Sequence, residues 1–236
     1  MSNAVSNDEF KREAANAAVE RYVESGMVVG LGTGSTATFA VQRIGELVAS
    51  GELRDLRGVP TSAKTTALAN ELGIPLATLS EARPLLTIDG TDEVSPELAL
   101  IKGRGGALLR EKIVASSSKE GLIVVADSTK WVDTLGTGPL PVEIDSFGWE
   151  VTLEALASLG CEPELRMDWT DPERPFVTDG GHYTADCRFD SIPDPASLET
   201  EIKKIPGALE CGLFVHIARA AIVAGKDGTH IEASPR

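Results

Sequence analysis

The sequence predicts an α/β protein in which a parallel sheet, covered by helices on both faces, is followed by a smaller α+β unit. Three observations carry this prediction. Short continuous apolar runs alternate with helix-forming segments over the first half of the 236 residues, which is typical of strands buried on both faces. The composition changes at GTGPLP, residues 136–141, a candidate hinge. The order of elements after this hinge is β-α-β-β-α-β, the split ferredoxin-like unit.

The first half begins with a capping box, Ser6 to Glu9, before an amphipathic helix that ends near Gly26. Four strands are then expected, in MVVGLG, RGVPTS, PLLTIDG and GLIVVADSTK. The helices between them are expected from TGST to Val48, from PTS to Leu72, and over ALLREKIVASSS.

The second half begins with a strand in LPVEID and a helix in GWEVTLEALASLG. A strand in EPELRMD follows, and FVTDGGHYTADCRF either pairs with it as one long strand or folds as a hairpin about Gly180–Gly181. A helix in PASLETEIKKIPG and a strand in ALECGLFV complete the unit. The tail AAIVAGKDGTHIEA is expected to form a hairpin that turns at Lys226 to Gly228.

Composition excludes several classes of protein. The net charge of −14 argues against nucleic acid or an anionic membrane as the main partner. The first residues contain no apolar core of a signal peptide, and no apolar run reaches transmembrane length, so we expect a cytoplasmic protein. The three cysteines are far apart and are expected to be reduced and buried. The three histidines are scattered, and we expect no metal site.

Four of the predicted strands end in polar segments: GTGSTA, PTSAKT, DGTDE and ADSTK. Parallel strands bring such ends together at one edge of the sheet, where open α/β sheets bind their ligands. The alternative, for any one of them, is a solvated turn.

The segment GLGTGST, Gly30 to Thr36, has glycines before a helix but is not a dinucleotide motif. Ser35 stands where that motif needs its third glycine, and no acidic residue follows at the required distance. Free N–H groups and the hydroxyls of Thr33, Ser35 and Thr36 suit a phosphate group at the helix N-terminus. The alternative is a capped helix start.

The segment DGTDE, Asp89 to Glu93, places three acids around a glycine turn. Such carboxylates can bind a metal, or they can hydrogen-bond sugar hydroxyls and transfer their protons. The alternative is a solvated acidic turn.

The stretch KGRGGALLREK, Lys102 to Lys112, combines glycines, cations and one glutamate. Residues 100–130 contain six basic and three acidic residues, a local balance of +3 in an acidic chain, which suits an anionic small molecule. On a helical wheel Glu111 shares its face with Ala107, Leu108, Val114 and Ala115, while Arg110 and Lys112 point to either side. Burial there would raise the pKa of Glu111 toward that of a useful general base. The alternative is a glutamate at the rim of the stripe, held by a lysine.

Together, GTGSTA, DGTDE, KGRGGALLREK and ADSTK, with PLPVEI and IPGALECGLF, resemble the type A ribose-5-phosphate isomerases over nearly the whole chain. The resemblance implies a Rossmann-like parallel sheet domain, residues 1–135 and 208–236. A second, smaller ferredoxin-like α+β domain, residues 136–207, is inserted before the C-terminal segment. It also implies interconversion of ribose 5-phosphate and ribulose 5-phosphate in the pentose phosphate pathway, without a metal or an organic cofactor.

The resemblance also implies the roles of individual residues. Glu111 corresponds to the base that moves a proton between C2 and C1 through an enediolate, and Lys102 to the cation that stabilises the oxyanion. Asp89 and Asp92 correspond to acids implicated in ring opening and hydroxyl contacts. The substrate contacts that follow from the matched motifs are Thr33, Gly34, Ser35, Thr36, Gly90, Thr91, Gly103, Arg104, Gly105 and Lys130.

The expected partner is a small sugar phosphate, and the family suggests a homodimer, with a tetramer as the alternative. One departure is visible: members often have DNGN where this chain has DGGH, Asp179 to His182.

The rival classes of similar fold are sugar-phosphate-sensing regulators, CoA transferases and amino-sugar phosphate deaminases. The acidic first helix disfavours a DNA-binding regulator, the short chain disfavours a CoA transferase, and KGRGGALLREK disfavours a deaminase.

Overall fold

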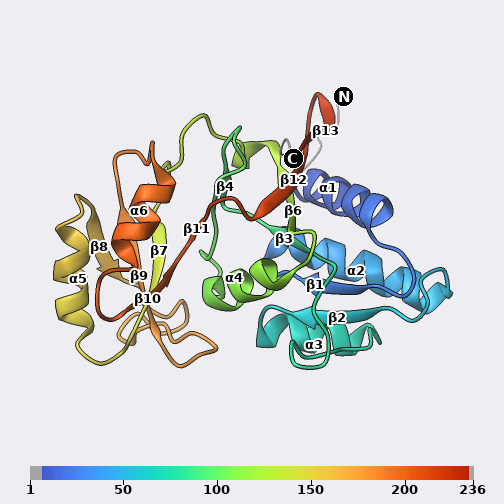
Figure 1. The fold of residues 1–236 in the computed structure, drawn as a ribbon, viewed down its shortest axis with the longest axis horizontal. Helices are drawn as coiled ribbons and strands as arrows, with labels where there is room; N and C mark the ends of the chain where they lie inside the picture. Colours follow the sequence, from blue (N-terminus) through green and yellow to red (C-terminus); the bar gives the residue numbers. More distant parts are fainter. Residues whose placement is uncertain (1–6, 234–236) are drawn as a thin grey trace.

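The computed structural model describes residues 7–233 and contains a six-stranded main sheet (Figure 1). Its strand order is β13-β12-β6-β3-β1-β2. The five strands from β12 to β2 are parallel, and β13 pairs antiparallel with β12 at the edge. The strands are β1 (Val28–Leu31), β2 (Arg57–Pro60), β3 (Leu86–Gly90), β6 (Leu122–Asp127), β12 (Ala218–Gly225) and β13 (Gly228–Ala233). This confirms the predicted parallel sheet and the hairpin of the tail.

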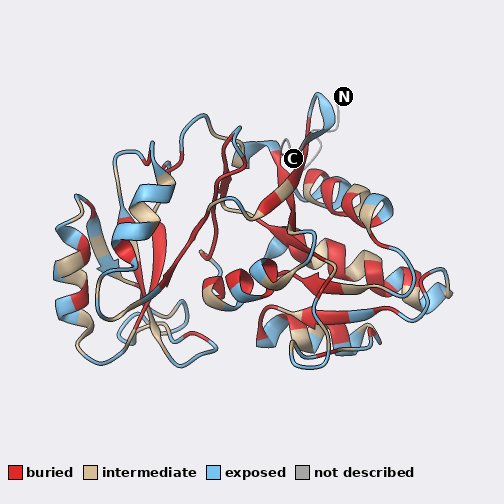
Figure 2. Cartoon of the chain, in the orientation of Figure 1, coloured by how far each residue is buried: buried red, intermediate tan, exposed pale blue. Residues whose placement is uncertain are grey.

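Helices cover the main sheet on both faces. They are α1 (Asn7–Tyr22), α2 (Ser35–Ser50), α3 (Ala63–Glu71) and α4 (Leu108–Ser117), and a short 3₁₀ helix, η1 (Ser128–Lys130), follows β6. Along β6, Ile123 and Val125 pack with α1 and α2, whereas Leu122 and Val124 pack on the opposite face with Ala115 of α4. Because successive side chains of a strand alternate between faces, a strand covered on both sides must be apolar throughout. Figure 2 shows the resulting buried strands. The predicted cap at Ser6 lies outside the described residues.

The second unit is an antiparallel four-stranded sheet of order β10-β7-β9-β8, with two helices. Its elements are β7 (Leu140–Ile144), α5 (Trp149–Ala157), β8 (Glu162–Leu165), β9 (Tyr183–Arg188), α6 (Pro195–Ile202) and β10 (Ala208–Cys211). This is the predicted split β-α-β-β-α-β arrangement. The strand β10 belongs to this sheet, so the expected boundary after residue 207 falls before the last strand of the unit.

The segment 176–189 was expected to form one long strand or a hairpin about Gly180–Gly181, but its strand is shorter than in either case. Within this segment only β9 pairs with β8. Residues 178–182 form a turn in which Thr178 N donates to His182 O at 2.9 Å. The three cysteines are buried free thiols, as expected. No helix within residues 7–233 is long and apolar enough to cross a membrane.

A third, small sheet of order β11-β5-β4 joins the two units, and the sequence did not predict it. It consists of β4 (Glu93–Val94), β5 (Leu100–Ile101) and β11 (Leu213–Phe214). In Figure 1 the chain runs from β10 of the second unit through β11 back to β12 of the main sheet. At Gly212, between β10 and β11, the N–H donates to Pro141 O at 2.7 Å and the carbonyl accepts from Lys102 N at 2.8 Å. A side chain at Gly212 would meet the Lys102 carbonyl at 2.2 Å, so only glycine fits.

Glu93 anchors the hinge between the two units. It is buried, and its carboxylate accepts from the N–H groups of Gly136, Thr137 and Gly138 at 2.8, 3.2 and 2.8 Å. It also accepts from the Thr137 hydroxyl at 2.7 Å and from Arg104 Nη2 at 2.7 Å. Burial raises the pKa of this carboxyl, but these hydrogen bonds outweigh burial, so its pKa is lowered and it stays ionised.

We expect Glu93→Ala to destabilise the protein by about 3–5 kcal/mol, because it leaves a guanidinium and three N–H groups without their acceptor. The midpoint of thermal unfolding should fall by at least about 6 °C. The matched control is Glu97→Ala, which removes an exposed glutamate of the adjoining turn. Equal midpoints for the two variants would contradict the role of Glu93.

Candidate active site

A polar cavity lies at the carboxyl ends of β1 and β3, the two strands between which the strand order reverses direction. Open α/β sheets bind ligands at such a switch point. The lining residues are Thr33, Gly34, Ser35, Thr36, Gly90, Thr91, Asp92, Lys102, Gly103, Gly105, Glu111 and Lys130. The structure therefore brings together all the residues singled out in the sequence except two. Asp89 lies behind the cavity wall, and Arg104 turns its guanidinium to Glu93.

The N-terminus of α2 faces this cavity without a side-chain cap. Gly34 is the N-cap, with a φ of 113° that suits glycine. The first bond of the helix runs from Thr38 N to Gly34 O at 2.9 Å. The N–H groups of residues 35–37 precede this bond, so they have no carbonyl partner within the helix. These donors and the helix dipole favour an anion.

The hydroxyl of Thr33 belongs to a cluster that fixes the β1–α2 turn. It lies 2.7, 2.8 and 3.0 Å from the hydroxyl oxygens of Thr61, Ser62 and Thr65, at the start of α3. Its N–H donates to Asp89 Oδ1 at 3.0 Å. The PTSAKT strand end therefore supports the cavity and does not line it.

Asp89, near the end of β3, is fully buried. Its Oδ1 accepts from the N–H groups of Thr33 and Gly90 at 3.0 and 2.7 Å, and its Oδ2 lies 3.1 Å from Lys102 Nζ. Gly32 makes room for this carboxylate, because a Cβ there would approach Asp89 Oδ1 to 2.2 Å. Burial raises the pKa of Asp89 despite the nearby ammonium and the two N–H donors.

Lys102 is 2% exposed and lies between two carboxylates. Its Nζ donates to Gly90 O at 2.6 Å and lies 3.4 Å from Glu111 Oε1. Burial lowers the pKa of this ammonium, but the charges of Asp89, Glu111 and Asp92 outweigh burial and raise its pKa to about 12. A permanent, buried positive charge therefore faces the cavity.

Glu111, in the first turn of α4, is 4% exposed, and it lies on the apolar face predicted for it. Its Oε2 is buried and has no hydrogen-bond partner among the described residues. Burial raises the pKa of Glu111 to about 8; Lys102 opposes this rise, and the charges of Asp89 and Asp92 add to it. A carboxylate with an unpartnered oxygen and such a pKa is suited to accept a proton from a ligand.

Lys112 was expected to point to the side of the helix, but it is buried. Its Nζ lies 2.7 Å from Glu199 Oε1 on α6 and 2.8 Å from Glu210 Oε1 on β10. The helix that carries Glu111 is thus fixed to the small domain by an ion pair on its neighbouring residue.

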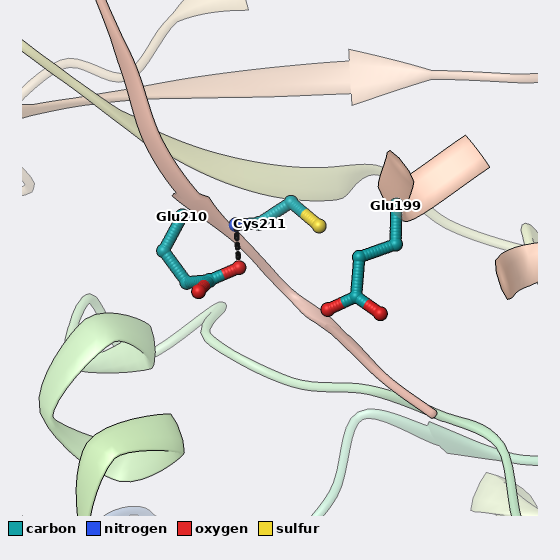
Figure 3. Close-up of side chains that lie close together, drawn as sticks. All are labelled: Glu199, Glu210 and Cys211. Atoms are coloured by element: carbon teal, nitrogen blue, oxygen red, sulfur yellow. Dashed lines mark hydrogen bonds between the residues drawn. The ribbon is translucent and has the colours of Figure 1, made fainter. Parts of the chain in front are cut away.

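Glu199, Glu210 and Cys211 form the one cluster with metal-ligand spacing among residues 7–233 (Figure 3). The ammonium of Lys112 already contacts both carboxylates of this cluster, and Lys203 lies 2.8 Å from Glu210 Oε2. Two lysine charges therefore already balance the two glutamates.

Asp92 and Lys130 complete the cavity. Asp92 is half-buried, and its Oδ2 accepts from Arg104 N at 3.0 Å, which fixes the glycine loop 103–106 against the end of β3. Lys130, in η1 after β6, brings a second cation to the same cavity. Sequence reasoning singled out Glu93 as an acid of DGTDE but missed its hydrogen bonds to residues 136–138, and it also missed Arg166 and the burial of Lys112. The partners of these side chains are distant in the chain, and no local pattern marks them.

The doubly wound sheet and its cavity define an α/β enzyme that binds a small anionic molecule at the switch point. The model of a family described as ribose 5-phosphate isomerase A (phosphoriboisomerase A) matches residues 57–228. The chain is 56% identical over 227 residues to the ribose-5-phosphate isomerase A of Gloeobacter violaceus, covering 95% of this chain and 96% of that protein. The corresponding protein of Bacillus mycoides is 50% identical over 209 residues, with 88% and 92% covered. This chain belongs to the ribose-5-phosphate isomerase A family, and it is an isomerase.

Solved structures agree with this assignment. A D-ribose-5-phosphate isomerase in complex with phospho-erythronic acid is 38% identical, with a TM-score of 0.93 and coverage of 97% of this chain and 100% of that one. The ribose 5-phosphate isomerase of Plasmodium falciparum is 41% identical, with a TM-score of 0.92 and the same coverage. The fold class predicted from the sequence is therefore confirmed.

We expect Glu111→Gln to gain stability relative to the wild type as the pH rises. The folded protein holds the Glu111 proton up to a pKa of about 8, whereas the unfolded chain releases it at the ordinary value of 4.5. The wild type therefore loses stability between these two pH values, and the glutamine does not. Thermal unfolding at pH 5 and pH 9 measures this difference, which should increase by a few degrees.

The matched control is Glu210→Gln. Burial raises the pKa of Glu210, but Lys112 and Lys203 outweigh burial, so its pKa is lowered. The ionised Glu210 therefore stabilises the fold at any pH above its ordinary pKa of 4.5. This variant should be less stable than the wild type at both pH values. If the difference in thermal midpoint between Glu111→Gln and the wild type were the same at pH 5 and pH 9, this would contradict the raised pKa of Glu111.

Proposed function

We propose that this protein interconverts D-ribose 5-phosphate and D-ribulose 5-phosphate, with Glu111 as the base that moves the proton. Family membership supports the reaction. The observation that supports the role of Glu111 is its buried carboxylate, which has one unpartnered oxygen and lies 3.4 Å from a buried ammonium. A base and an oxyanion partner side by side are what proton transfer next to a carbonyl requires.

The two ends of the cavity suit the two ends of the substrate. The N-terminus of α2 and Lys130 provide N–H donors and positive charge for the phosphate. Lys102 and Glu111 then receive the carbonyl end. Binding of the phosphate, remote from the reacting carbons, contributes energy that orients C1 and C2. The family resemblance assigns ring opening and hydroxyl contacts to Asp89 and Asp92; of the two, Asp92 lines the cavity and Asp89 lies behind its wall.

The proposed reaction of the open-chain aldose has three proton transfers. Glu111 removes the proton from C2, the electron pair of that C–H bond forms a C1=C2 double bond, and O1 gains negative charge beside Lys102. The resulting enediolate takes the proton of the O2 hydroxyl onto O1. The electron pair on O2 then forms the C2 carbonyl while Glu111 returns its proton to C1. Glu111 ends in its starting state, and the sugar has exchanged an aldehyde for a ketone.

Burial explains how an ordinary carboxylate can do this. A carboxylate in water is a weak base toward a carbon acid, but burial raises the pKa of Glu111 to about 8 and closes much of that gap. The Lys102 charge, already held in place by Gly90 and Asp89, stabilises the oxyanion without reorganisation. The positive charge thus comes from the protein, and the proposal includes no metal or organic cofactor.

The remaining parts of the proposal follow the family. The reaction belongs to the non-oxidative pentose phosphate pathway, in the cytoplasm, with a homodimer as the proposed assembly and a tetramer as the alternative. The proposed substrate is a small sugar phosphate. Its negative charge is complementary to the cations that line the cavity, although the chain as a whole has a net charge of −14.

Glu111→Gln should lower kcat by about 10²–10⁴-fold, because the amide cannot accept the C2 proton. Substrate binding should be largely preserved, since the amide has nearly the same shape. Ketose formation from ribose 5-phosphate measures the loss of overall turnover. Exchange of the C2 proton with D₂O measures the loss of proton removal from C2. Glu46→Gln, in an exposed turn of α2, is the control. Turnover of Glu111→Gln at the wild-type rate would exclude Glu111 as the base.

Lys102→Met should lower kcat by about 10²–10³-fold through loss of the oxyanion partner. It should also lower the thermal midpoint, because two buried carboxylates lose their cation. Lys102→Arg keeps the charge and separates these effects: it should be closer to the wild type in stability but still impaired in kcat, since the charge moves from its place. If Lys102→Met kept the wild-type kcat, Lys102 would have no part in the reaction.

A further inference from the structure

Arg166 of the small domain reaches the glycine loop of the active site. It directly follows β8, and it is 7% exposed. Its Nη1 donates to both Gly103 O and Arg104 O at 3.1 Å. Its Nε donates to Asp186 Oδ2 on β9 at 2.8 Å, and its Nη2 contacts Asp186 Oδ1. One guanidinium therefore connects the small sheet to two consecutive peptide groups of the loop.

The first of these peptide groups is held from both sides. A trans peptide group is planar, and its C=O and N–H point in opposite directions. In the peptide group between Gly103 and Arg104, the carbonyl accepts from Arg166 and the N–H donates to Asp92 Oδ2 at 3.0 Å. Its orientation is therefore fixed by Arg166 on one side and by Asp92 on the other.

The second peptide group is held only at its carbonyl. Arg104 O accepts from Arg166, so the N–H of Gly105 must point away from Arg166. Gly105 lines the cavity, and its N–H has no hydrogen-bond partner among residues 7–233. An exposed N–H group in a fixed orientation is a ready donor to a ligand oxygen.

The small domain also limits the position of the loop at its far end. The ring of Phe176 packs against Gly106, where a Cβ would meet it at 2.3 Å. Phe176 N in turn donates to Arg166 O at 2.8 Å. Lys102, by contrast, does not depend on Arg166: its N–H is held by Gly212 O, and its ammonium by Gly90 O and Asp89.

We propose that Arg166 is a positioning residue that directs the Gly105 N–H group at the substrate, with Asp186 holding its guanidinium in place. The proposal rests on the proposed function, because it takes the substrate to be the sugar phosphate. A donor that contacts the substrate equally in the ground state and the transition state contributes to KM and not to kcat. Arg166 therefore acts on substrate affinity, and Glu111 and Lys102 act on turnover.

The test compares Arg166→Met, Arg166→Lys and the wild type in the ketose-forming assay. Arg166→Met keeps an apolar stem but has no donor, so KM should rise about tenfold, the loss expected for one hydrogen bond to a charged ligand, while kcat changes less than about threefold. The pH dependence of kcat should be unchanged, because the surroundings of Glu111 are intact. Arg166→Lys has a single ammonium to contact both the loop carbonyls and Asp186, so it should give an intermediate KM.

The matched control is Ile202→Ala, which creates a cavity in the core of the small domain without contacting the loop. It should lower the thermal midpoint, as Arg166→Met does, but leave KM unchanged at a temperature where both variants are folded. A second readout is the amide NMR signal of Gly105. Added phospho-erythronic acid, the compound bound to a related isomerase, should shift this signal in the wild type and much less in Arg166→Met.

The outcomes separate this inference from the proposed function. A wild type that forms no ketose would refute the proposed function. An active wild type, with a KM for Arg166→Met within about twofold of it, would refute the positioning role alone. An equal rise in KM for Ile202→Ala would also refute it, because general loosening of the small domain would then explain the effect.

Discussion

The ammonium of Lys102 lies between the carboxylates of Asp89 and Glu111, all three nearly excluded from water, and the site depends on this arrangement. Two buried acids share one cation, so one negative charge lacks a full partner. Asp89 has two N–H donors on Oδ1, but one buried oxygen of each acid, Asp89 Oδ2 and Glu111 Oε2, has no hydrogen-bond partner among the described residues. Burial therefore raises the pKa of both acids, and it raises that of Glu111 to about 8. The cost in stability and the proposed basicity have the same physical origin.

The fold is arranged so that three separate segments supply these groups. Asp89 lies near the end of β3, Lys102 follows the short strand β5, and Glu111 is on α4 after the glycine loop. The small domain holds this arrangement from the other side. Glu93 fastens the hinge, Gly212 accepts from the Lys102 N–H, and Lys112 ties α4 to α6 and β10. We therefore regard the second domain as a support that fixes the loop and the helix of the site.

The sequence predicted the features that depend on local patterns. Apolar runs gave the parallel strands, and helical periodicity placed Glu111 on the buried face of α4. Features that depend on distant partners were not predicted. The strands of the third sheet have two residues each, too short for any periodicity. Lys112 is buried because its carboxylate partners arrive from residues 199 and 210. Arg166 contacts the site through backbone carbonyls. Because every residue has a backbone carbonyl, the sequence does not indicate which ones accept hydrogen bonds from Arg166.

The central claim is that the Glu111 carboxyl has a raised pKa because it is buried and shares the single ammonium of Lys102 with Asp89. The most direct test is a pH titration of protein labelled with ¹³C at the glutamate carboxyl carbons, followed by NMR. The resonance missing from Glu111→Gln identifies Glu111. We predict that this resonance titrates with a pKa of about 8. A titration near the ordinary value of 4.5 would contradict the account.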